Sequence, residues 1–266
     1  MLLQHPRIPE YSVEGIILKI DHTNLSLTAS YEEIDRLCQE ALRPIQDFTW
    51  LNAAAVCVRP NFVGRAADVL RGTRVALSFV TGFPDFPWPR YYPYGFPSTD
   101  QMAYETKYGI RSVKFRDPDA RVEVDMVANF AHALEGRFDL YARQISSLVQ
   151  VCNDEGARLK VIFENCMLPH ETIKKACYEA ALEPLSRLLL KPGYFKTSTG
   201  YGFWGATVED VKLMRSVGGN HVGYKPSGGL TTDNIASFID ALDYLKTYHI
   251  RFGSSSLLTK LVQESR

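Results

Sequence analysis

The stretch Phe195-Lys196-Thr197-Ser198-Thr199-Gly200-Tyr201 places a lysine, three hydroxyl side chains and a glycine directly after a short apolar segment. An ammonium group next to a protein core is costly to keep charged, so such a lysine can lose its proton and become an amine nucleophile. The hydroxyl groups can bind a polar substrate, and the glycine lets the backbone turn and approach a ligand closely. The stretch therefore predicts a reactive amine beside a polar binding site.

A second lysine, Lys225, also ends an apolar run and is followed by Pro226-Ser227-Gly228-Gly229. Two lysines at the ends of neighbouring strands would repel each other, and each would lower the pKa of the other. The alternative is that both are solvated loop cations. Because each lysine is followed by a turn of small residues, we favour the catalytic interpretation.

Eight apolar segments alternate with amphipathic segments along the chain, which predicts strands that alternate with helices. The expected strands are 15–20, 53–58, 74–80, 121–128, 159–163, 194–197, 221–225 and 250–253, and the expected helices are 31–41, 62–70, 100–113, 134–152, 170–182, 208–217 and 232–248 with one more at the C-terminus. Ser30 and Thr231 are candidate N-caps of the helices that follow them.

Nearly continuous apolar strands joined by helices indicate a parallel sheet, and eight such units in roughly 250 residues are typical of a (β/α)8 barrel. A doubly wound open sheet is the alternative. Polar residues recur where nearly every strand ends, and in a barrel all these ends meet at one face, which favours the barrel. We expect residues 1–266 to form one barrel domain.

The segment 85–99 interrupts the alternation of strands and helices, because it contains many Pro, Tyr, Phe and Trp residues. It cannot form a regular helix or a central strand, and it is too aromatic for a flexible linker. We expect an ordered insertion after the third strand that packs on the protein, either over the active face or at an oligomer contact.

In a closed barrel, the strand-end residues that could take part in catalysis or binding lie together at one mouth. They are Asp21 and Thr23, Cys57, Asp125, Glu164, Lys196 and Lys225, followed by the turns 227–229 and 253–256. The two turns lie where barrels commonly bind phosphate through backbone N–H groups. The lysine could attack a carbonyl and form an iminium, an electron sink for breaking a neighbouring C–C bond, while Asp125 and a water move protons. Glu123 and Glu164 are expected in ion pairs inside the barrel, and Cys57 in packing.

Over nearly its whole length the chain resembles the deoxyribose-phosphate aldolases. The resemblance rests on Asp21-His22-Thr23, Val56-Cys57-Val58-Arg59-Pro60, Gly82-Phe83-Pro84, Glu123-Val124-Asp125-Met126-Val127, Leu159-Lys160-Val161-Ile162, Lys196-Thr197-Ser198-Thr199-Gly200, Lys225-Pro226-Ser227-Gly228-Gly229 and Arg251-Phe252-Gly253-Ser254-Ser255-Ser256. The resemblance implies a class I aldolase with the barrel fold that reversibly cleaves 2-deoxy-D-ribose 5-phosphate to glyceraldehyde 3-phosphate and acetaldehyde, without a metal or other cofactor.

The matching motifs imply a role for each site residue. Lys196 would form the Schiff base, Lys225 would lower its pKa, and Asp125 would relay protons. Asp21 would support Lys225, while Thr23, Cys57 and Thr199 would lie at the substrate. Phosphate would be held by Gly200, Gly228, Gly229, Gly253, Ser255 and Ser256.

The chain departs from the family pattern at two positions that can carry cations, where it has Tyr201 and Thr231, and in the insertion 85–99. These changes keep open a related lysine aldolase that acts on a different, unphosphorylated aldehyde, with an acceptor pocket partly built by the insertion. A non-catalytic barrel is disfavoured because Asp21, Asp125 and both lysines are present.

The segment Gly200-Tyr201-Gly202-Phe203-Trp204-Gly205 also matches the Gly-x-Gly-x-x-Gly dinucleotide pattern. However, no acidic residue follows about 20 residues later to bind a ribose. A nicotinamide-dependent oxidoreductase is therefore a minor alternative.

Composition narrows the remaining classes of function. Thirty basic and thirty acidic residues give a formal net charge of zero, which disfavours a nucleic-acid or membrane-surface partner. The five cysteines and six histidines show no zinc-binding spacing, and the N-terminus lacks the apolar core of a signal peptide. We expect a cytoplasmic enzyme with a small-molecule aldehyde or sugar-phosphate substrate, and base rates suggest a homodimer.

Overall fold

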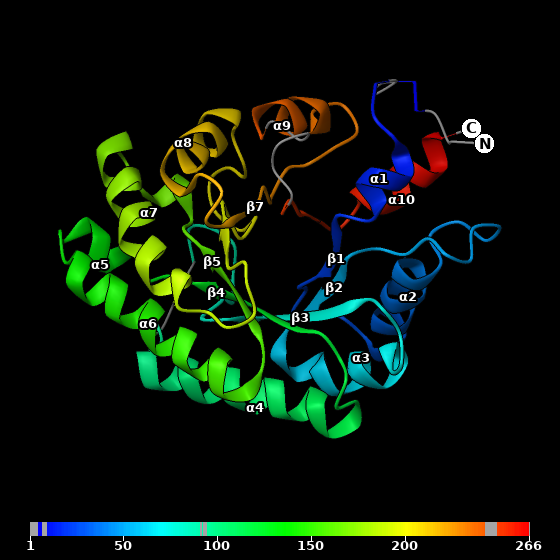
Figure 1. Cartoon of the computed structure of the whole chain (residues 1–266), viewed down its shortest axis with the longest axis horizontal. Coiled ribbons are helices and arrows are strands. Elements are labelled where there is room, and N and C mark those ends of the chain that lie inside the picture. The colour runs from blue at the N-terminus through cyan, green and yellow to red at the C-terminus, as the bar shows by residue number, and fades with distance from the viewer. Residues whose placement is uncertain (1–4, 7–9, 91, 93–94, 243–248, 266) are drawn as a thin grey trace.

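The strands and helices of the computed structural model alternate along the chain as expected, and residues 5–6, 10–90, 92, 95–242 and 249–265 are described (Figure 1). The strands are β1 (Ile20–Asn24), β2 (Ala55–Val58), β3 (Ala76–Thr81), β4 (Val122–Val127), β5 (Arg158–Ile162), β6 (Tyr194–Lys196), β7 (Gly223–Lys225) and β8 (Phe252–Ser254). The α-helices are α1 (Val13–Ile17), α2 (Tyr31–Leu42), α3 (Val63–Leu70), α4 (Thr99–Arg116), α5 (Phe130–Leu134), α6 (Phe138–Glu155), α7 (Glu171–Ser186), α8 (Val208–Gly218), α9 (Ile235–Ala241) and α10 (Leu257–Glu264). Two 3-10 turns are η1 (Pro60–Phe62) and η2 (Asn165–Met167).

All eight strands belong to one sheet in the order β7-β6-β5-β4-β3-β2-β1-β8, and every pairing is parallel. Bridges from Tyr224 to Ile250 and from Ser227 to Gly253 join the two ends of this order. The helices surround the strands (Figure 1). The expected (β/α)8 barrel is confirmed, and its topology brings the carboxyl ends of the strands to one face.

The helices form where apolar residues share one face and where a side chain caps the N-terminus. In α2 the buried residues are Ile34, Leu37, Cys38 and Ala41, which share the face toward the strands. The Ser30 side chain accepts a hydrogen bond from the backbone N–H of Glu33, and the Glu33 side chain accepts one from the backbone N–H of Ser30, as in a capping box. The expected Ser30 cap is therefore confirmed.

Three expected elements differ from the structure. Residues 15–17 of the expected first strand, 15–20, belong to the short helix α1, and β1 begins only at Ile20. The Ser12 side chain caps this helix by accepting from the N–H of Gly15, and periodicity alone cannot separate a short buried helix from a strand. The expected helix 134–152 is divided between α5 and α6 at Gly136, whose φ is 72°.

The expected helix 232–248 begins later than predicted, with Asn234 rather than Thr231 at the N-cap of α9. Thr231 instead donates its backbone N–H to the side chain of Asn234. The rest of that expected helix, residues 243–248, lies outside the described residues.

The described part of the insertion packs against the loop that follows β6. The Trp88 ring centroid lies 4.2 Å from that of Phe203, and the backbone N–H of Trp88 donates to the backbone carbonyl of Tyr201 at 2.9 Å. Tyr92 donates its hydroxyl to the carbonyl of Gly82, and its ring contacts Phe96. The insertion is thus anchored at the mouth of the barrel. Within the described residues, no helix combines the length and apolar character needed to cross a membrane.

Candidate active site

The two lysines identified in the sequence meet at one carboxylate inside the barrel. Lys196 Nζ lies 2.8 Å from Asp125 Oδ2, and Lys225 Nζ lies 2.7 Å from the same oxygen. The register explains this meeting, because Lys196 of β6 pairs with Lys225 of β7 and Asp125 lies on β4 of the same barrel interior. All three side chains are buried. The structure therefore brings together the three residues that were predicted to be catalytic.

A larger set of buried charges surrounds this meeting point. We call it the charged layer, and it consists of Asp21, Glu123, Asp125, Lys160, Lys225 and Arg251. Lys160 Nζ lies within 3.3 Å of three different carboxylates, and Arg251 contacts Asp21 at 2.6 Å and Glu123 at 2.9 Å. Ser78 donates its hydroxyl to Asp125 at 2.8 Å. Buried charges are tolerated when they are paired in this way.

The layer gives the two lysines opposite pKa shifts. Burial lowers the pKa of Lys196, and nearby Lys225 lowers it further, against the opposing effect of Asp125. Burial alone would lower the pKa of Lys225 too, but Asp125 and Asp21 together raise it above its usual range. The pKa of Lys225 is therefore raised overall rather than lowered, because Lys225 contacts two carboxylates.

The carboxylates of the layer remain ionised. Burial works against the charged form of Asp125, but Lys160, Lys196 and Lys225 hold its pKa well below the usual range. Lys160, which burial would neutralise, has its pKa raised well above the usual range by Asp125, Asp21 and Glu123. The charged layer thus places ionised side chains next to Lys196, whose own pKa is lowered.

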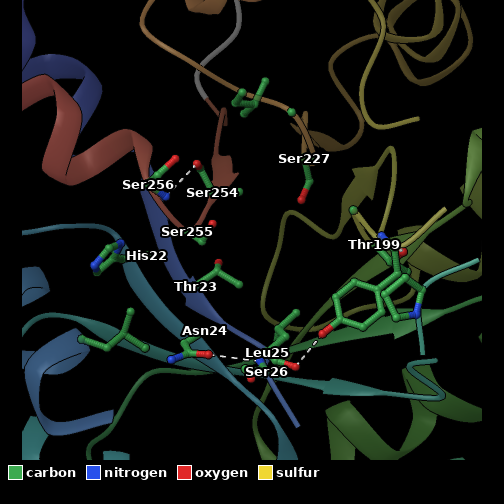
Figure 2. Close-up of a pocket in the computed structure, with 18 of the residues that line it drawn as sticks. His22, Thr23, Asn24, Leu25, Ser26, Thr199, Ser227, Ser254, Ser255 and Ser256 are labelled. Atoms are coloured by element: carbon green, nitrogen blue, oxygen red, sulfur yellow. Dashed lines mark hydrogen bonds between the residues drawn. The ribbon is translucent and has the colours of Figure 1, made fainter. Parts of the chain in front are cut away.

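A cavity of about 830 Å³ opens above the layer. Lys196 lines it, together with residues of the turns after β1, β6, β7 and β8. Figure 2 shows Thr199 on one side and Ser254–Ser256 on the other, with Thr23 and Ser227 between them. The Lys196 amine is therefore next to a space large enough for a small sugar phosphate, surrounded by hydroxyl groups.

Most of the predicted binding residues line this cavity: Thr23, Thr199, Gly200, Gly228, Gly229, Gly253, Ser255 and Ser256. Asp21, Cys57, Asp125 and Lys225 are not among the lining residues. Asp21 lies in the charged layer below, 2.6 Å from Lys225. Cys57 is buried with Leu25 and Val80, and burial raises the pKa of its thiol.

The cavity wall carries few charges. The charged lining side chains are Lys196, Arg36, Glu33, Glu40 and Asp85. Tyr201 and Thr231 line it at the two positions where family members can carry cations. From the insertion, Asp85, Phe86 and Pro87 contribute to the wall, so the insertion helps to form the cavity.

No role was predicted for Lys160 and Arg251, which belong to the layer, or for Ser78, which donates a hydrogen bond to it. Lys160 carried a signal, because a lysine within Leu159-Lys160-Val161-Ile162 interrupts an otherwise apolar strand. Its partners become visible only with the sheet register, in which Lys160 lies opposite Asp125. Glu123 forms the ion pairs expected of it, whereas the contacts of Glu164 described below are hydrogen bonds to Thr199.

The glycine-rich segment after Lys196 serves close packing. A Cβ on Gly205 would lie 2.1 Å from the carbonyl oxygen of Gly228, and a Cβ on Gly202 would lie 2.2 Å from the sulfur of Cys166. These contacts explain two of the glycines in the dinucleotide-like pattern without a nucleotide. Within the described part of the chain, no three His, Cys, Asp or Glu side chains are grouped so that they could hold a metal ion.

Comparison with known proteins identifies the family. No protein-family model matches the chain. The deoxyribose-phosphate aldolase of Aciduliprofundum boonei is 38% identical over 213 residues, which cover 79% of this chain and 82% of that protein. The deoxyribose-phosphate aldolase of Caldanaerobacter subterraneus subsp. tengcongensis is 35% identical over 258 residues, 96% of this chain and 95% of that protein.

Solved structures agree with this result. A crystal structure from Coccidioides immitis, described as that of a deoxyribose-phosphate aldolase, has a TM-score of 0.75 and 30% identity over 99% of this chain and 89% of that chain. The tetrameric deoxyribose phosphate aldolase of Aeropyrum pernix shares the fold, with a TM-score of 0.71 and 22% identity over 95% of this chain and 91% of that chain. The chain therefore belongs to the deoxyribose-phosphate aldolase family.

Proposed function

We propose that this protein is a class I aldolase that reversibly cleaves 2-deoxy-D-ribose 5-phosphate to D-glyceraldehyde 3-phosphate and acetaldehyde through a Schiff base on Lys196. The observation that carries this mechanism is the position of the Lys196 amine, which lines the cavity, has a lowered pKa and lies 2.8 Å from the Asp125 carboxylate. A neutral amine can attack a carbonyl, whereas an ammonium cannot, and a lowered pKa increases the neutral fraction of Lys196.

The reaction follows from these groups. The amine of Lys196 adds to the C1 aldehyde of the open-chain sugar, and loss of water leaves an iminium. A base removes the proton of the C3 hydroxyl, the C2–C3 bond breaks, and its electron pair moves to the iminium to give an enamine and glyceraldehyde 3-phosphate. Protonation of the enamine at C2 and addition of water release acetaldehyde and restore the amine.

Lys225 and Asp125 are suited to move these protons. Lys225 stays protonated because its pKa is raised, and it shares one oxygen of Asp125 with Lys196. A proton can thus pass between the two lysines, Asp125 and a water in the cavity. Asp21, which contacts Lys225 at 2.6 Å, supports this arrangement from below.

The turns after β6, β7 and β8 are suited to hold the substrate. Thr23 and Thr199 would bind sugar hydroxyls, and Gly200, Gly228, Gly229, Gly253, Ser255 and Ser256 would hold the phosphate. Two amides at the start of α10 already donate to the Ser254 hydroxyl, those of Ser256 and Leu257 (Figure 2 shows the first). A phosphate there would have to compete with Ser254 or use the neighbouring amides.

The cavity wall also supports a second substrate class, an unphosphorylated aldehyde such as that of 2-deoxyribose. Tyr201 and Thr231 place neutral groups where cations could bind phosphate, and the charged lining residues include three carboxylates. Comparing kcat/KM for 2-deoxyribose 5-phosphate and 2-deoxyribose separates the two classes. A higher value for the phosphorylated sugar supports the main proposal, and a higher value for the free sugar supports the second class.

The test of the mechanism is cleavage of 2-deoxyribose 5-phosphate, with both products measured. We expect wild type to form acetaldehyde and glyceraldehyde 3-phosphate in equal amounts, and Lys196→Met to lose activity by at least about 1,000-fold. The matched control is Lys175→Met at an exposed lysine, which should keep full activity. Retained activity in folded Lys196→Met would contradict the proposal. The predicted homodimer is checked separately by sedimentation equilibrium.

A further inference from the structure

Glu164 has an unusual backbone conformation just after β5. Its φ of 52° and ψ of 60° lie in the left-handed region, and it is the non-glycine residue with positive φ in the described part of the chain. A side chain in this region strains the backbone, and such strain persists where the surrounding structure enforces it, often at functional sites. This conformation places the fully buried carboxyl of Glu164 next to the loop that follows Lys196.

The Glu164 carboxylate accepts several hydrogen bonds from one residue of that loop. The backbone N–H of Thr199 donates to it at 3.3 Å and 3.4 Å, and the Thr199 hydroxyl donates to Oε2. The thiol of Cys166 contacts Oε1 at 3.5 Å. Thr199 lines the cavity and Glu164 does not. Glu164 thus holds a residue of the cavity wall from behind.

Thr199 is in turn hydrogen-bonded to other residues at the mouth of the barrel. Its hydroxyl accepts a hydrogen bond from the Tyr201 N–H at 2.9 Å, and the Tyr201 hydroxyl donates to the Leu25 carbonyl at 2.8 Å. The Tyr201 carbonyl accepts from the Trp88 N–H at 2.9 Å. A continuous chain of hydrogen bonds therefore runs from Glu164 through Thr199 and Tyr201 to the insertion and to the loop after β1.

We propose that Glu164 is a positioning residue for the acceptor half of the substrate, fixing Thr199 and the turn to Tyr201 at the cavity wall. The proposal rests on the proposed aldolase function. The charge of Lys196 acts on Glu164 less than its hydrogen bonds to Thr199 do, and the Lys196 amine is paired with Asp125, so the main effect of losing Glu164 is expected at Thr199. Loss of Glu164 should therefore weaken binding of the sugar phosphate while the two-carbon reaction at Lys196 continues.

A second carboxylate, on the half-buried Glu105, provides a matched control. Glu105 accepts a hydrogen bond from the Thr81 hydroxyl at 2.6 Å, and Thr81, at the end of β3, is not among the residues that line the cavity. Burial raises the pKa of Glu105 as it does that of Glu164. Glu105→Gln therefore alters the same kind of Glu–Thr pair away from the cavity wall.

The central variant is Glu164→Gln, which keeps the size but replaces one acceptor with a donor. With one oxygen replaced by an NH2 group, glutamine cannot reproduce all the hydrogen bonds that the two oxygens of Glu164 accept from the N–H and the hydroxyl of Thr199. We expect KM for 2-deoxyribose 5-phosphate to rise about fivefold to tenfold, which is the size of effect expected when one or two hydrogen bonds are lost. Borohydride trapping of acetaldehyde on Lys196 should stay within about twofold of wild type, and Glu105→Gln should change neither quantity.

A double-mutant cycle tests whether the effect passes through Thr199. Thr199→Val should raise KM by itself, and adding Glu164→Gln should then raise it by less than about twofold. If Glu164→Gln unfolds the protein, Glu164→Gly serves instead, because glycine accepts the left-handed backbone without strain. It should be folded and show the same rise in KM with trapping retained.

Three results would overturn the proposal: unchanged KM in Glu164→Gln, an equal rise in Glu105→Gln, or loss of acetaldehyde trapping in step with KM, which would indicate a general structural role. Each is distinct from failure of the proposed function. That failure would appear in wild type, as absence of any acetaldehyde adduct on Lys196.

Discussion

The charged layer and the cavity wall above it are built from opposite kinds of groups. The layer holds fully paired buried charges on strands, in which Lys160 alone contacts three carboxylates. The wall consists mainly of hydroxyls, glycines and apolar side chains on the turns after the strands. Lys196 joins the two regions, because it contacts Asp125 of the layer below and lines the cavity above. The contrast assigns reactivity to the rigid layer and substrate selection to the loops.

Removing Asp125 should have the largest effect, because this carboxylate contacts Lys160, Lys196 and Lys225. In Asp125→Asn we expect kcat to fall by about 100-fold to 10,000-fold, the range for a lost proton-transfer group. Stability should fall as well, because three buried cations lose a charged partner. Steady-state kinetics and urea unfolding measure the two effects. The exposed Asp119→Asn should match wild type, and a kcat within tenfold of wild type in Asp125→Asn would contradict the role of the layer.

Replacing Lys225 should shift the pH dependence of the reaction. Lys196 reacts as the neutral amine, so activity is present above its pKa and is lost as pH falls through it. Lys225 is one cause of the lowered pKa of Lys196, so Lys225→Met should raise that pKa and move the acidic limb of the kcat/KM profile to higher pH. We also expect kcat at its optimum to fall about 100-fold. An unmoved acidic limb would show that Lys225 does not tune Lys196.

Lys160 should matter mainly for stability. Lys160→Met removes the cation that three buried carboxylates contact. Breaking a buried ion pair in this way lowers the free energy of unfolding by about 3–5 kcal/mol. Urea unfolding at neutral pH measures the loss, with exposed Lys175→Met as the control. A loss below about 1 kcal/mol would contradict the buried network.

The same pKa shifts set the pH range of wild-type stability. The pKa of Lys160 is raised above its usual 10.5, so its stabilisation is complete below pH 10.5 and is lost as pH rises through the folded-state pKa. The pKa of Asp125 is lowered below its usual 3.8, so its contribution is present above pH 3.8 and is lost as pH falls through the folded-state pKa. Between these limits the layer should stabilise the fold evenly. Unfolding free energies measured across this range check the prediction.

The smallest effect is expected on the wall, at Arg36. Its guanidinium lines the cavity and lies 4.0 Å from Glu33, and its side chain is 67% exposed. In Arg36→Ala we expect KM for 2-deoxyribose 5-phosphate to rise about twofold to fivefold, and KM for 2-deoxyribose to stay unchanged, because only the phosphate is charged. Exposed Arg74→Ala is the control. An equal change for both sugars would show that Arg36 does not contact the phosphate end.

The sequence allowed the barrel and the three central residues to be predicted, because both depend on local patterns. Strand–helix alternation indicated the barrel, and Lys196, Lys225 and Asp125 all lie on the strands that it identified. Glu123 and Asp125 are two residues apart on β4 and therefore share one face, and both contact Lys160. The failure at α1 had a local cause, since Val13–Ile17 is too short for its periodicity to separate helix from strand.

The rest of the site depended on contacts that no local pattern contains. The raised pKa of Lys225 requires Asp21 and Asp125, which come from two other strands. The link from Glu164 to Thr199 depends on a left-handed backbone at a residue type that seldom adopts it. The insertion could be predicted to be ordered, with the active face as one of two expected positions, but only the structure assigns Asp85–Pro87 to the cavity wall.

The central claim, that Lys196 is the reactive amine, is tested most directly by borohydride reduction with acetaldehyde, followed by peptide mass mapping. We predict one reduced two-carbon adduct on Lys196 and none on Lys225 or Lys160, whose raised pKa values keep them protonated. The same experiment with 2-deoxyribose 5-phosphate should label the same residue. An adduct on Lys225 instead, or no adduct on folded protein with either compound, would contradict the assignment of the reactive amine.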